Sequence, residues 1–425
     1  MLFDTLLDDI VIPRFVRVRD HRVAERIEGV AAAVRQALDS RGAKEALRPG
    51  MRVCVCCGSR EIANFQTIVR AVVDYVRACG AEPFIIPTMG SHGGATAEGQ
   101  RAILEGYGLT EDVVGAPIRA TMETVEIGRA DNGMSVQLDV YANEADYIIP
   151  IARVKPHTDF HGRIESGLCK MLVIGLGKQH GAYICHKYGF HNMAKNIWSV
   201  SKTVVEKKPN LMALSVIENC FHETYRIDAV PAARIHEEEP ELLEIARAQM
   251  GRLPFDEADT LIVNEIGKEI SGAGMDPNIT GRYTCLPNER PFFQSIAVLD
   301  VTEKSHGNCG GIGAADVTTR RLFEKFDFEA TYPNAITVGN GLGTRIPPVM
   351  PNDRLAVKFA LRSVSDFKDE RELVRAIWIR NTLALDEFMI SESLLDEARA
   401  NPELEILGEP EEIRFDEQGA LLTKI

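Results

Sequence analysis

The sequence predicts an α/β protein made of two domains, each with a mostly parallel sheet. Short apolar runs typical of buried strands alternate with longer stretches in which apolar residues recur at helical spacing. The chain has 425 residues, which is too many for one ordinary hydrophobic core. We therefore expect one domain over residues 1–255 and a second over residues 256–425. A return of the last segment to the first domain is the alternative.

The first domain begins with a β-α-β-α pattern. Its predicted strands are the apolar runs at residues 51–57, 83–87, 147–151 and 211–219. Helical spacing from Ile62 to Val76 predicts a helix that ends at Gly80, and another helix is expected from about Thr96. Crossover connections place the loops after parallel strands at one edge of the sheet, where ligands bind in open α/β folds. The loops after the first three strands should therefore meet.

The second domain begins after an acidic stretch at residues 237–250, which we read as a helix with a solvated start. Its predicted strands are residues 260–266, 295–302, 334–340 and 354–361. A helix is expected over residues 314–326. Because clefts between domains favour the binding of small molecules, we expect the active site between the two domains.

Charge and composition narrow the class of partner. The net charge of -14 opposes binding to nucleic acids and to anionic membranes, so a small-molecule ligand is favoured. The first residues carry acids where a signal peptide has basic ones, and no apolar stretch is long enough to cross a bilayer. The nine cysteines lack the spacing of a disulfide framework, which suits a reducing compartment. We expect a cytoplasmic protein and leave its oligomeric state open, a homo-oligomer included.

Side chains suited to proton transfer or metal binding fall in the three loops expected at the sheet edge. The first loop contains Arg60, the second His92, and the third, "KPHTDFH", contains His157 and His161. A histidine taken singly is most often a hydrogen-bonding loop residue. Neutral imidazole suits both proton transfer near pH 7 and metal ligation. Several imidazoles at one edge therefore predict a reaction site.

The stretch "GLCKMLVIGLGKQHGAYICH", residues 167–186, looks at first like a dinucleotide-binding loop. The fingerprint G-x-G-x-x-G fails, because the third glycine comes one residue late and no acidic residue follows at the required distance. What remains is a glycine-containing segment that begins near Lys170 and ends at His186.

Three segments resemble the nickel-dependent lactate racemase family. They are "GSHGGAT", "KPHTDF" and "ESGLCKMLVIGLGKQHGAYICH", within roughly residues 50–195. Members of that family hold a nickel-pincer nucleotide, pyridinium-3,5-bisthiocarboxylate mononucleotide nickel. In the family a lysine in an S-G-x-x-K segment is joined covalently to this cofactor, and a histidine sixteen positions later ligates the nickel. The resemblance implies these roles for Lys170 and His186.

The resemblance also implies an activity. It indicates a nickel-dependent isomerase that racemises or epimerises a 2-hydroxy acid by reversible hydride transfer to the cofactor. His92 and His157 would be the two general acid/bases, and Arg60 would bind the substrate carboxylate. Such an enzyme depends on separate cofactor-biosynthesis enzymes as partners.

Further contacts are expected on both sides of the site. On the cofactor side we expect Gly175, Gly177 and Lys178, whose backbone amides and ammonium suit a phosphate. On the substrate side, the loop "GKEISGAGMDPNITGR" offers Lys268, Asn278 and Arg282. The alternative for this loop is a structural turn with solvated charges.

This chain departs from the family pattern at several places. Cys57 stands where the family has an aspartate three residues before the arginine. About three extra residues separate His157 from Lys170, so His161 is the alternative second base. The substrate-contacting tyrosine, glutamine and lysine that the family has in its C-terminal domain also lack a clear counterpart here. These departures predict a substrate other than lactate, and the sequence does not identify which 2-hydroxy acid it is.

Two other functions remain open at this point. One is a hydrolase or lyase in which His92, His157, His161 and His186 bind Zn or Fe directly. The other is a non-catalytic relative that binds a small molecule.

Overall fold

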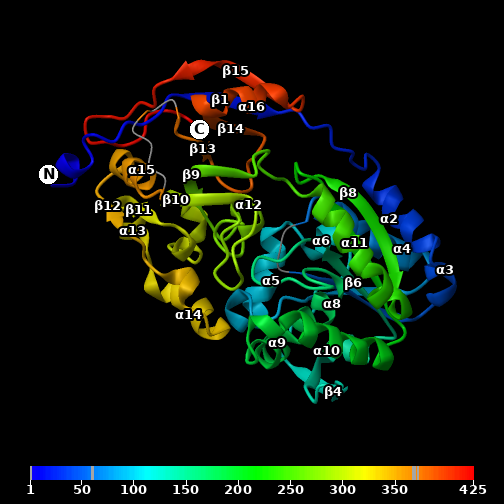
Figure 1. Ribbon diagram of the computed structural model, residues 1–425. Helices are drawn as coiled ribbons and strands as arrows, with labels where there is room; N and C mark the ends of the chain where they lie inside the picture. Colours follow the sequence, from blue (N-terminus) through cyan, green and yellow to red (C-terminus); the bar gives the residue numbers. More distant parts are fainter. Residues whose placement is uncertain (1, 59–61, 366–369, 371–372) are drawn as a thin grey trace. The chain divides into compact units, whose positions relative to one another are not determined.

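The computed structural model describes residues 2–58, 62–365, 370 and 373–425 (Figure 1). The chain divides into two compact units. The first unit is Ala24–Met250, and the second combines Met1–Val23 with Gly251–Ile425. Each unit contains a sheet flanked by helices, so the α/β class expected from the sequence is confirmed.

The division differs from the expected one, residues 1–255 and 256–425, at the start of the chain. β1 (Phe15–Asp20) lies between β14 (Glu387–Ser391) and β15 (Leu404–Glu411) and is antiparallel to both. These backbone pairings place the first segment in the second unit. It is therefore the beginning of the chain, and not its end, that joins the other unit.

A five-stranded sheet forms the centre of the Ala24–Met250 unit. Its strands, in order across the sheet, are β3 (Glu82–Pro87), β2 (Arg52–Cys57), β6 (Tyr147–Arg153), β7 (Met212–Glu218) and β8 (Thr224–Pro231). The first four are parallel, and β8 is antiparallel to β7. Cys57 lies opposite both Pro87 and Ile151, so β2, β3 and β6 end side by side. The loops after these strands begin at one edge, as the sequence predicts.

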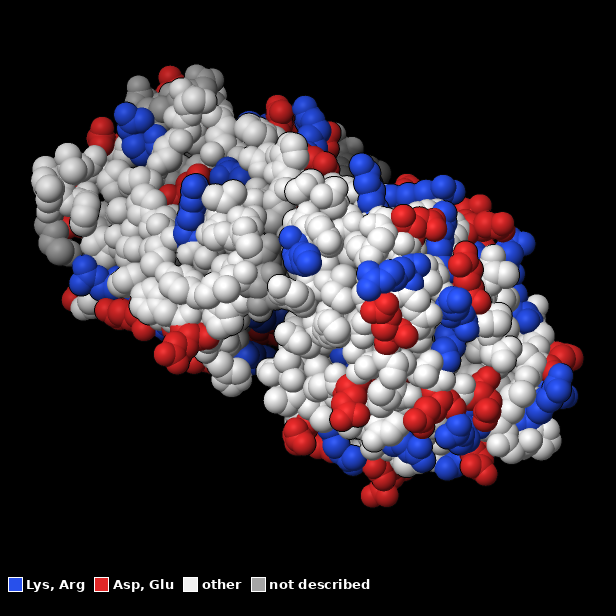
Figure 2. Space-filling model, turned by 90° about the horizontal axis from the view of Figure 1, so that it is seen from below, with Lys and Arg blue, Asp and Glu red and all other residues white. Residues whose placement is uncertain are grey.

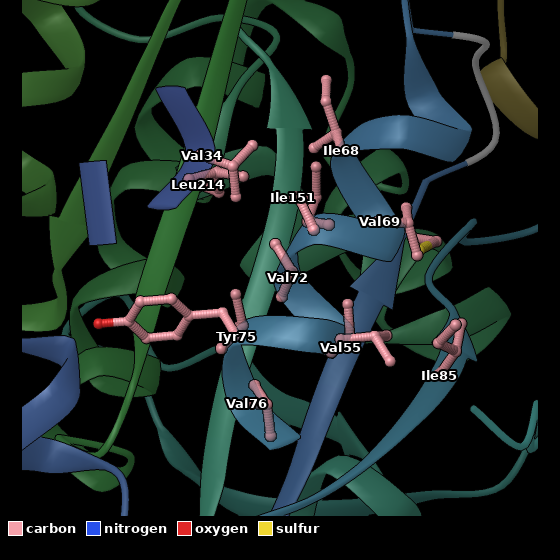
Figure 3. Packing of buried hydrophobic residues seen from close by; sticks show 14 of the residues in the cluster. Val34, Val55, Ile68, Val69, Val72, Tyr75, Val76, Ile85, Ile151 and Leu214 are labelled. Atoms are coloured by element: carbon pink, nitrogen blue, oxygen red, sulfur yellow. The ribbon is translucent and has the colours of Figure 1, made fainter. Parts of the chain in front are cut away.

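Helices cover both faces of this sheet. Side chains alternate along each strand, so they divide between two apolar layers. On one face, Val55 and Leu214 pack with α2 (Val30–Asp39) and α4 (Phe65–Ala78), as Figure 3 shows. On the other face, Cys54 and Cys56 pack with residues of the helices between positions 168 and 246. The strands are thus buried on both faces, as is usual in parallel sheets.

The second unit is built on an eight-stranded mixed sheet. Its strands, in order across the sheet, are β12 (Val349–Met350), β11 (Val317–Thr319), β10 (Phe292–Val301), β9 (Glu257–Ile266), β13 (Ala376–Ile379), β14, β1 and β15. Neighbours from β12 to β13 run parallel. β14, β1 and β15 are antiparallel to their neighbours. The runs predicted as strands at residues 260–266 and 295–302 form parts of β9 and β10.

Two of the strands predicted in this unit are wrong. Residues 334–340 lie mostly in α14 (Phe328–Val338), and residues 354–361 lie in α15 (Asp353–Arg362). Each helix starts at a side-chain cap that an apolar run does not reveal. The Asp327 carboxylate accepts the backbone N–H of Ala330, and the Asn352 side chain accepts that of Leu355.

The helix predicted over residues 314–326 is only partly correct. Its second half is α13 (Arg320–Lys325), but the preceding residues form β11, which pairs with β10. Thr319 ends the strand, and its hydroxyl caps the helix by accepting the backbone N–H of Leu322.

Charged side chains of both signs intermingle on the face of the molecule seen in Figure 2, without a broad area of one sign. This face therefore lacks the continuous basic surface with which proteins bind nucleic acids. Within the described ranges, no helix combines the length and the apolar character needed to cross a membrane.

We expect Ile68→Ala to destabilise the Ala24–Met250 unit by roughly 2–5 kcal/mol, because it leaves a cavity in a packed core. Ile68 is fully buried on α4 (Figure 3). Urea unfolding followed by circular dichroism measures the change. The control is Val113→Ala, at a side chain that is 43% exposed. It should change the unfolding free energy by less than about 0.5 kcal/mol, and an equal effect of both substitutions would contradict the assignment of the core.

Candidate functional site

The loop that follows β6 is closed by a short backbone bridge. Lys155 and Ser166 form an isolated antiparallel β-bridge. In this bridge each N–H donates to the carbonyl of the other residue, at 3.0 and 3.2 Å. The residues between them make a closed loop that carries His157. From the bridge the chain passes directly into α8 (Leu168–Lys170), so the loop and the start of this helix lie side by side.

Lys170 and His157 meet next to this bridge. Lys170 Nζ lies 2.5 Å from His157 Nε2. The other ring nitrogen, Nδ1, accepts the backbone N–H of Asp159 at 3.0 Å. A neutral imidazole has a single N–H, so with Nδ1 as the acceptor its proton is on Nε2, the nitrogen that faces Lys170.

His157 is held in its neutral form by its surroundings. Burial lowers the pKa of His157 well below its usual value, and the basic side chains around it, Lys170 and Lys155 among them, lower it further. The ring is only 11% exposed. Because a protonated ring would be disfavoured here, the donor and acceptor roles assigned above hold at neutral pH.

His186 lies at the end of α9 (Lys178–His186) with its ring orientation set by the backbone. Nδ1 lies 2.6 Å from the Ala182 carbonyl. A carbonyl can only accept, so Nδ1 carries the proton and Nε2 carries the lone pair. Burial lowers the pKa of His186, although the bond to the carbonyl opposes the shift. A neutral ring with one nitrogen held by a carbonyl is the form in which histidine binds metals.

Two phenylalanines link Lys170, His157 and His186. Phe160 stacks on His157 with 4.2 Å between ring centroids, and Lys170 Nζ lies 5.9 Å from the centre of the Phe160 ring. Phe190 lies edge-on to His186 at 5.6 Å and 6.4 Å from His157. The structure therefore brings the amine and both imidazoles into one cluster, which we call the amine–imidazole cluster.

The stretch 167–186 forms an interrupted helix. α8 continues into the π-helical turn η2 (Met171–Gly175) and then into α9. Such turns are rare and often occur at functional sites. A Cβ at Gly175 would lie 3.0 Å from the carbonyl oxygen of Thr88, and one at Gly177 would lie 2.2 Å from a carbonyl of η2. Both glycines thus allow close packing, and their contact with a cofactor stays a prediction.

Lys178 has internal partners and not the exposed ammonium that a phosphate contact requires. Its side chain is fully buried, and Nζ lies 3.1 Å from Asp139 Oδ2. It also donates to the Pro87 carbonyl and, at 3.3 Å, to Gln100 Oε1. An ammonium has three N–H donors, and these three partners can use all of them. The contacts favour a structural role for Lys178 over the predicted cofactor contact.

His92 lies on the neighbouring loop, after β3, and is exposed. Its carbonyl accepts from Gln100 Nε2 at 3.3 Å, and the same amide donates to the Gly90 carbonyl at 2.9 Å. A Cβ at Gly90 would lie 3.0 Å from the side chain of Ile174, so this loop packs on η2. Gln100 connects the buried Lys178 to the backbone of the His92 loop. A role for His92 as the second acid/base stays a prediction.

His161, the alternative to His157, belongs to a buried hydrogen-bonding centre around Glu165. His161 Nδ1 lies 3.1 Å from Glu165 Oε1. The same carboxylate accepts the backbone N–H of His157 at 2.6 Å and pairs with Arg247. Since it is His157 whose ring contacts Lys170, the geometry favours His157 over His161.

Arg60 and Cys57 are two further positions singled out from the sequence. Arg60 lies outside the described residues. Cys57 is fully buried in the apolar layer beside α4, and burial raises the pKa of its thiol well above the usual value. Its thiol is therefore an inert part of the core.

The predicted substrate loop belongs to the second unit. Its residues have partners there: Lys268 with the Gly272 carbonyl, Asn278 with Asp276 and Tyr283, and Arg282 with Asp316 and the Phe293 carbonyl. Both terminal nitrogens of the Arg282 guanidinium bond to protein oxygens. These contacts favour the structural alternative for Arg282, and substrate contacts of Lys268 and Asn278 stay predictions.

Sequence reasoning missed three residues that hold the cluster, Glu165, Glu239 and Arg247. The acidic stretch that contains Glu239 was expected to be solvated at its start, but Glu239 is fully buried. Its Oε2 accepts the backbone N–H of Cys169 at 2.8 Å. The sequence contains one signal of this burial. Glu239 lies three residues before Leu242, which places it on the apolar face of the helix.

The fold is of the α/β class. The amine–imidazole cluster contains a nucleophilic type of side chain, Lys170, and a metal-binding type, His186. Residues 8–196 match the family model described as the lactate racemase N-terminal domain.

Among solved structures, the chain is similar to the lactate racemase apoprotein from Thermoanaerobacterium thermosaccharolyticum. The identity is 14% and the TM-score 0.44, over 71% of this chain and 69% of the other. No curated protein matches the sequence significantly.

We expect Glu239→Gln to change how stability depends on pH. Burial raises the pKa of Glu239 to about 7, from 4.5 for an ordinary glutamate. Between pH 4.5 and about pH 7, the Glu239 carboxyl of the folded protein keeps a proton that it has released in the unfolded chain. The stabilisation is therefore present below about pH 4.5 and lost as the pH rises towards 7.

Glutamine cannot ionise, so Glu239→Gln should gain stability over the wild type, on the order of 3 kcal/mol, between about pH 5 and pH 7.5. Urea unfolding at both pH values measures this gain. The control is Glu238→Gln on the same helix, whose carboxylate pairs with Arg41. The same stability difference at both pH values would show that Glu239 does not titrate in this range.

Proposed function

We propose that the protein is a racemase or epimerase of a 2-hydroxy acid that works with a nickel-pincer nucleotide attached to Lys170. The observation that carries the proposal is the contact between the Lys170 amine and His157, beside a His186 ring whose Nε2 is ready to bind a metal. The match of residues 8–196 to the lactate racemase N-terminal domain supports the isomerase class.

The residues of the cluster fit this cofactor. Lys170 supplies an amine, which in its uncharged form attacks an electrophilic carbon. His186 would supply an imidazole nitrogen as the protein's ligand to the nickel. Such a nickel needs one protein ligand. Among the residues that the structure describes, no group of three or more His, Cys, Asp and Glu side chains is placed to hold a metal ion. When bound, the cofactor would supply the acceptor for hydride from the substrate Cα.

Proton transfer is the task of the histidines. Racemisation requires an acid/base on each face of the substrate, and we assign these roles to His157 and His92. In the tautomer with its proton on Nδ1, His157 Nε2 would carry the lone pair that takes the hydroxyl proton, and the resulting imidazolium would return it. The Asp159 carboxylate lies 3.9 Å from Nδ1, where it can stabilise an Nδ1 proton when Nε2 acts as the base. The low pKa of His157 keeps the ring neutral between these steps.

Substrate binding and cofactor supply complete the proposal. Arg60 would hold the substrate carboxylate through its planar guanidinium, with Lys268 and Asn278 as further contacts. Separate cofactor-biosynthesis enzymes would act on this protein as partners, and the cytoplasm would be the site of both.

The attachment is tested by producing the protein together with cofactor-building proteins, then measuring intact mass and nickel content. We expect the wild type to carry a covalent adduct and nickel, and Lys170→Ala to lose the adduct. His186→Ala should keep the adduct and lose most of the nickel, because one of four ligands is removed. Lys195→Ala, at an exposed lysine of α10 (Met193–Lys207), is the matched control. An adduct on Lys170→Ala would overturn the anchoring role.

The reaction is tested on the loaded protein with a panel of single-enantiomer 2-hydroxy acids, followed by chiral chromatography. His157→Asn should lower kcat roughly 10²–10⁴-fold, the usual contribution of a general acid/base, while the adduct and the nickel remain. Turnover at the wild-type rate would exclude His157 as an acid/base. Tight binding of a hydroxy acid without turnover by the loaded wild type would favour the alternative of a non-catalytic relative.

A further inference from the structure

We propose that α11 (Ile235–Gln249) positions the amine–imidazole cluster: Glu239 holds the turn that carries Lys170, and Arg247, through Glu165, holds the loop that carries His157. α11 lies beyond residue 196, where the family match ends. It packs against α8 and β7; α8 and α11 are labelled in Figure 1. The inference rests on the proposed function only for the roles of Lys170 and His157.

The first contact is made by Glu239. Its carboxylate is fully buried, and Oε2 accepts the backbone N–H of Cys169 at 2.8 Å. This N–H belongs to the first turn of a helix, where backbone donors lack helical partners. A Cβ at Gly167 would lie 2.3 Å from Glu239 Oε1, so the carboxylate also lies against the residue that enters the turn. Lys170, the next residue after Cys169, is thereby placed.

The second contact is made by Arg247. Its guanidinium pairs with Glu165, whose carboxylate is fully buried. Glu165 accepts the backbone N–H groups of His157 and Gly162, at 2.6 and 3.2 Å, and meets the His161 ring. The carboxylate thus binds the backbone of the closed loop at two positions. Arg247 supplies a positive charge that compensates a carboxylate removed from water.

The two contacts hold the two segments that lie next to the backbone bridge. Glu165 lies directly before Ser166 of the backbone bridge, and Cys169 lies three residues after it. Glu239 and Arg247 are two turns apart on α11, about 12 Å along the helix axis. One rigid helix therefore holds both segments and sets where the Lys170 amine stands relative to the His157 ring.

The energetics also point to a positioning role. A buried carboxylate is costly, and burial raises the pKa of Glu239 to about 7. The helix therefore keeps this carboxylate, and with it the acceptor for the Cys169 N–H, against the cost of its burial. Groups that cost stability are found where function requires them.

The test uses the full-length protein without cofactor. Trace acetylation with acetic anhydride at neutral pH, read by peptide mass spectrometry, gives the labelling of Lys170 relative to exposed Lys195. The ¹⁵N shifts of the His157 ring report its tautomer. Glu239→Leu and Arg247→Met remove the two contacts, whereas Glu239→Gln and Arg247→Lys keep an acceptor and a cation. Glu238→Gln, on the same helix, is the control.

We expect Glu239→Leu and Arg247→Met to lower the Lys170-to-Lys195 ratio roughly tenfold or more, as for the loss of a charge-assisted hydrogen bond. The His157 shifts should change with them. Glu239→Gln and Arg247→Lys should restore most of the ratio, and Glu238→Gln should leave it unchanged. A purely structural helix would lower the melting temperature without moving the ratio or the shifts.

Folded Glu239→Leu and Arg247→Met variants with wild-type ratios and shifts would overturn the proposal. So would equal behaviour of Glu239→Leu and Glu239→Gln. If Glu239→Leu does not fold, Glu239→Asp takes its place, because its carboxylate is one methylene too short, and it must lower the ratio. No cofactor is present in this assay. A negative result in this assay therefore does not contradict the racemase proposal. A negative turnover test does not contradict the positioning role of α11.

Discussion

Two backbone hydrogen bonds between Lys155 and Ser166 are the constraint on which the site depends. They close the loop after a buried strand and start the next helix at the same point. The amine of Lys170 and the ring of His157 meet because their segments leave this bridge together. Side-chain contacts then refine a distance that the main chain has already set, which is a robust way to place reactive groups.

The parts of the site that could be predicted from the sequence are those that depend on residues close together in the chain. Lys170 and His186 follow from their spacing within one segment, and His157 follows from its place after a strand. The pairing of Glu165 with Arg247 could not be predicted in this way, because 82 residues separate them and no local pattern joins them. Burial is equally invisible: a lysine between glycine and glutamine looks exposed in the sequence, yet Lys178 is fully buried.

Prediction of the fold from the sequence has the same limit. The strands of the first sheet could be predicted because buried parallel strands are short apolar runs, and β2, β3 and β6 have this form. In the second unit similar runs belong to the helices α14 and α15, whose starts are decided by single capping side chains, Asp327 and Asn352. The division of the chain depends on the pairing of β1 with strands at the other end of the sequence, which composition does not reveal.

That pairing has a consequence for synthesis in the cell. β1 emerges from the ribosome before β14 and β15, its two neighbours, because the whole of Ala24–Met250 lies between them in the sequence. The eight-stranded sheet therefore cannot be completed until β15 has been made, whereas Ala24–Met250 is available earlier. During this interval β1 has exposed edges that can pair with other chains. Removing β14 and β15 would leave the edges of β1 open permanently, and removing β1 would open the facing edges of β14 and β15.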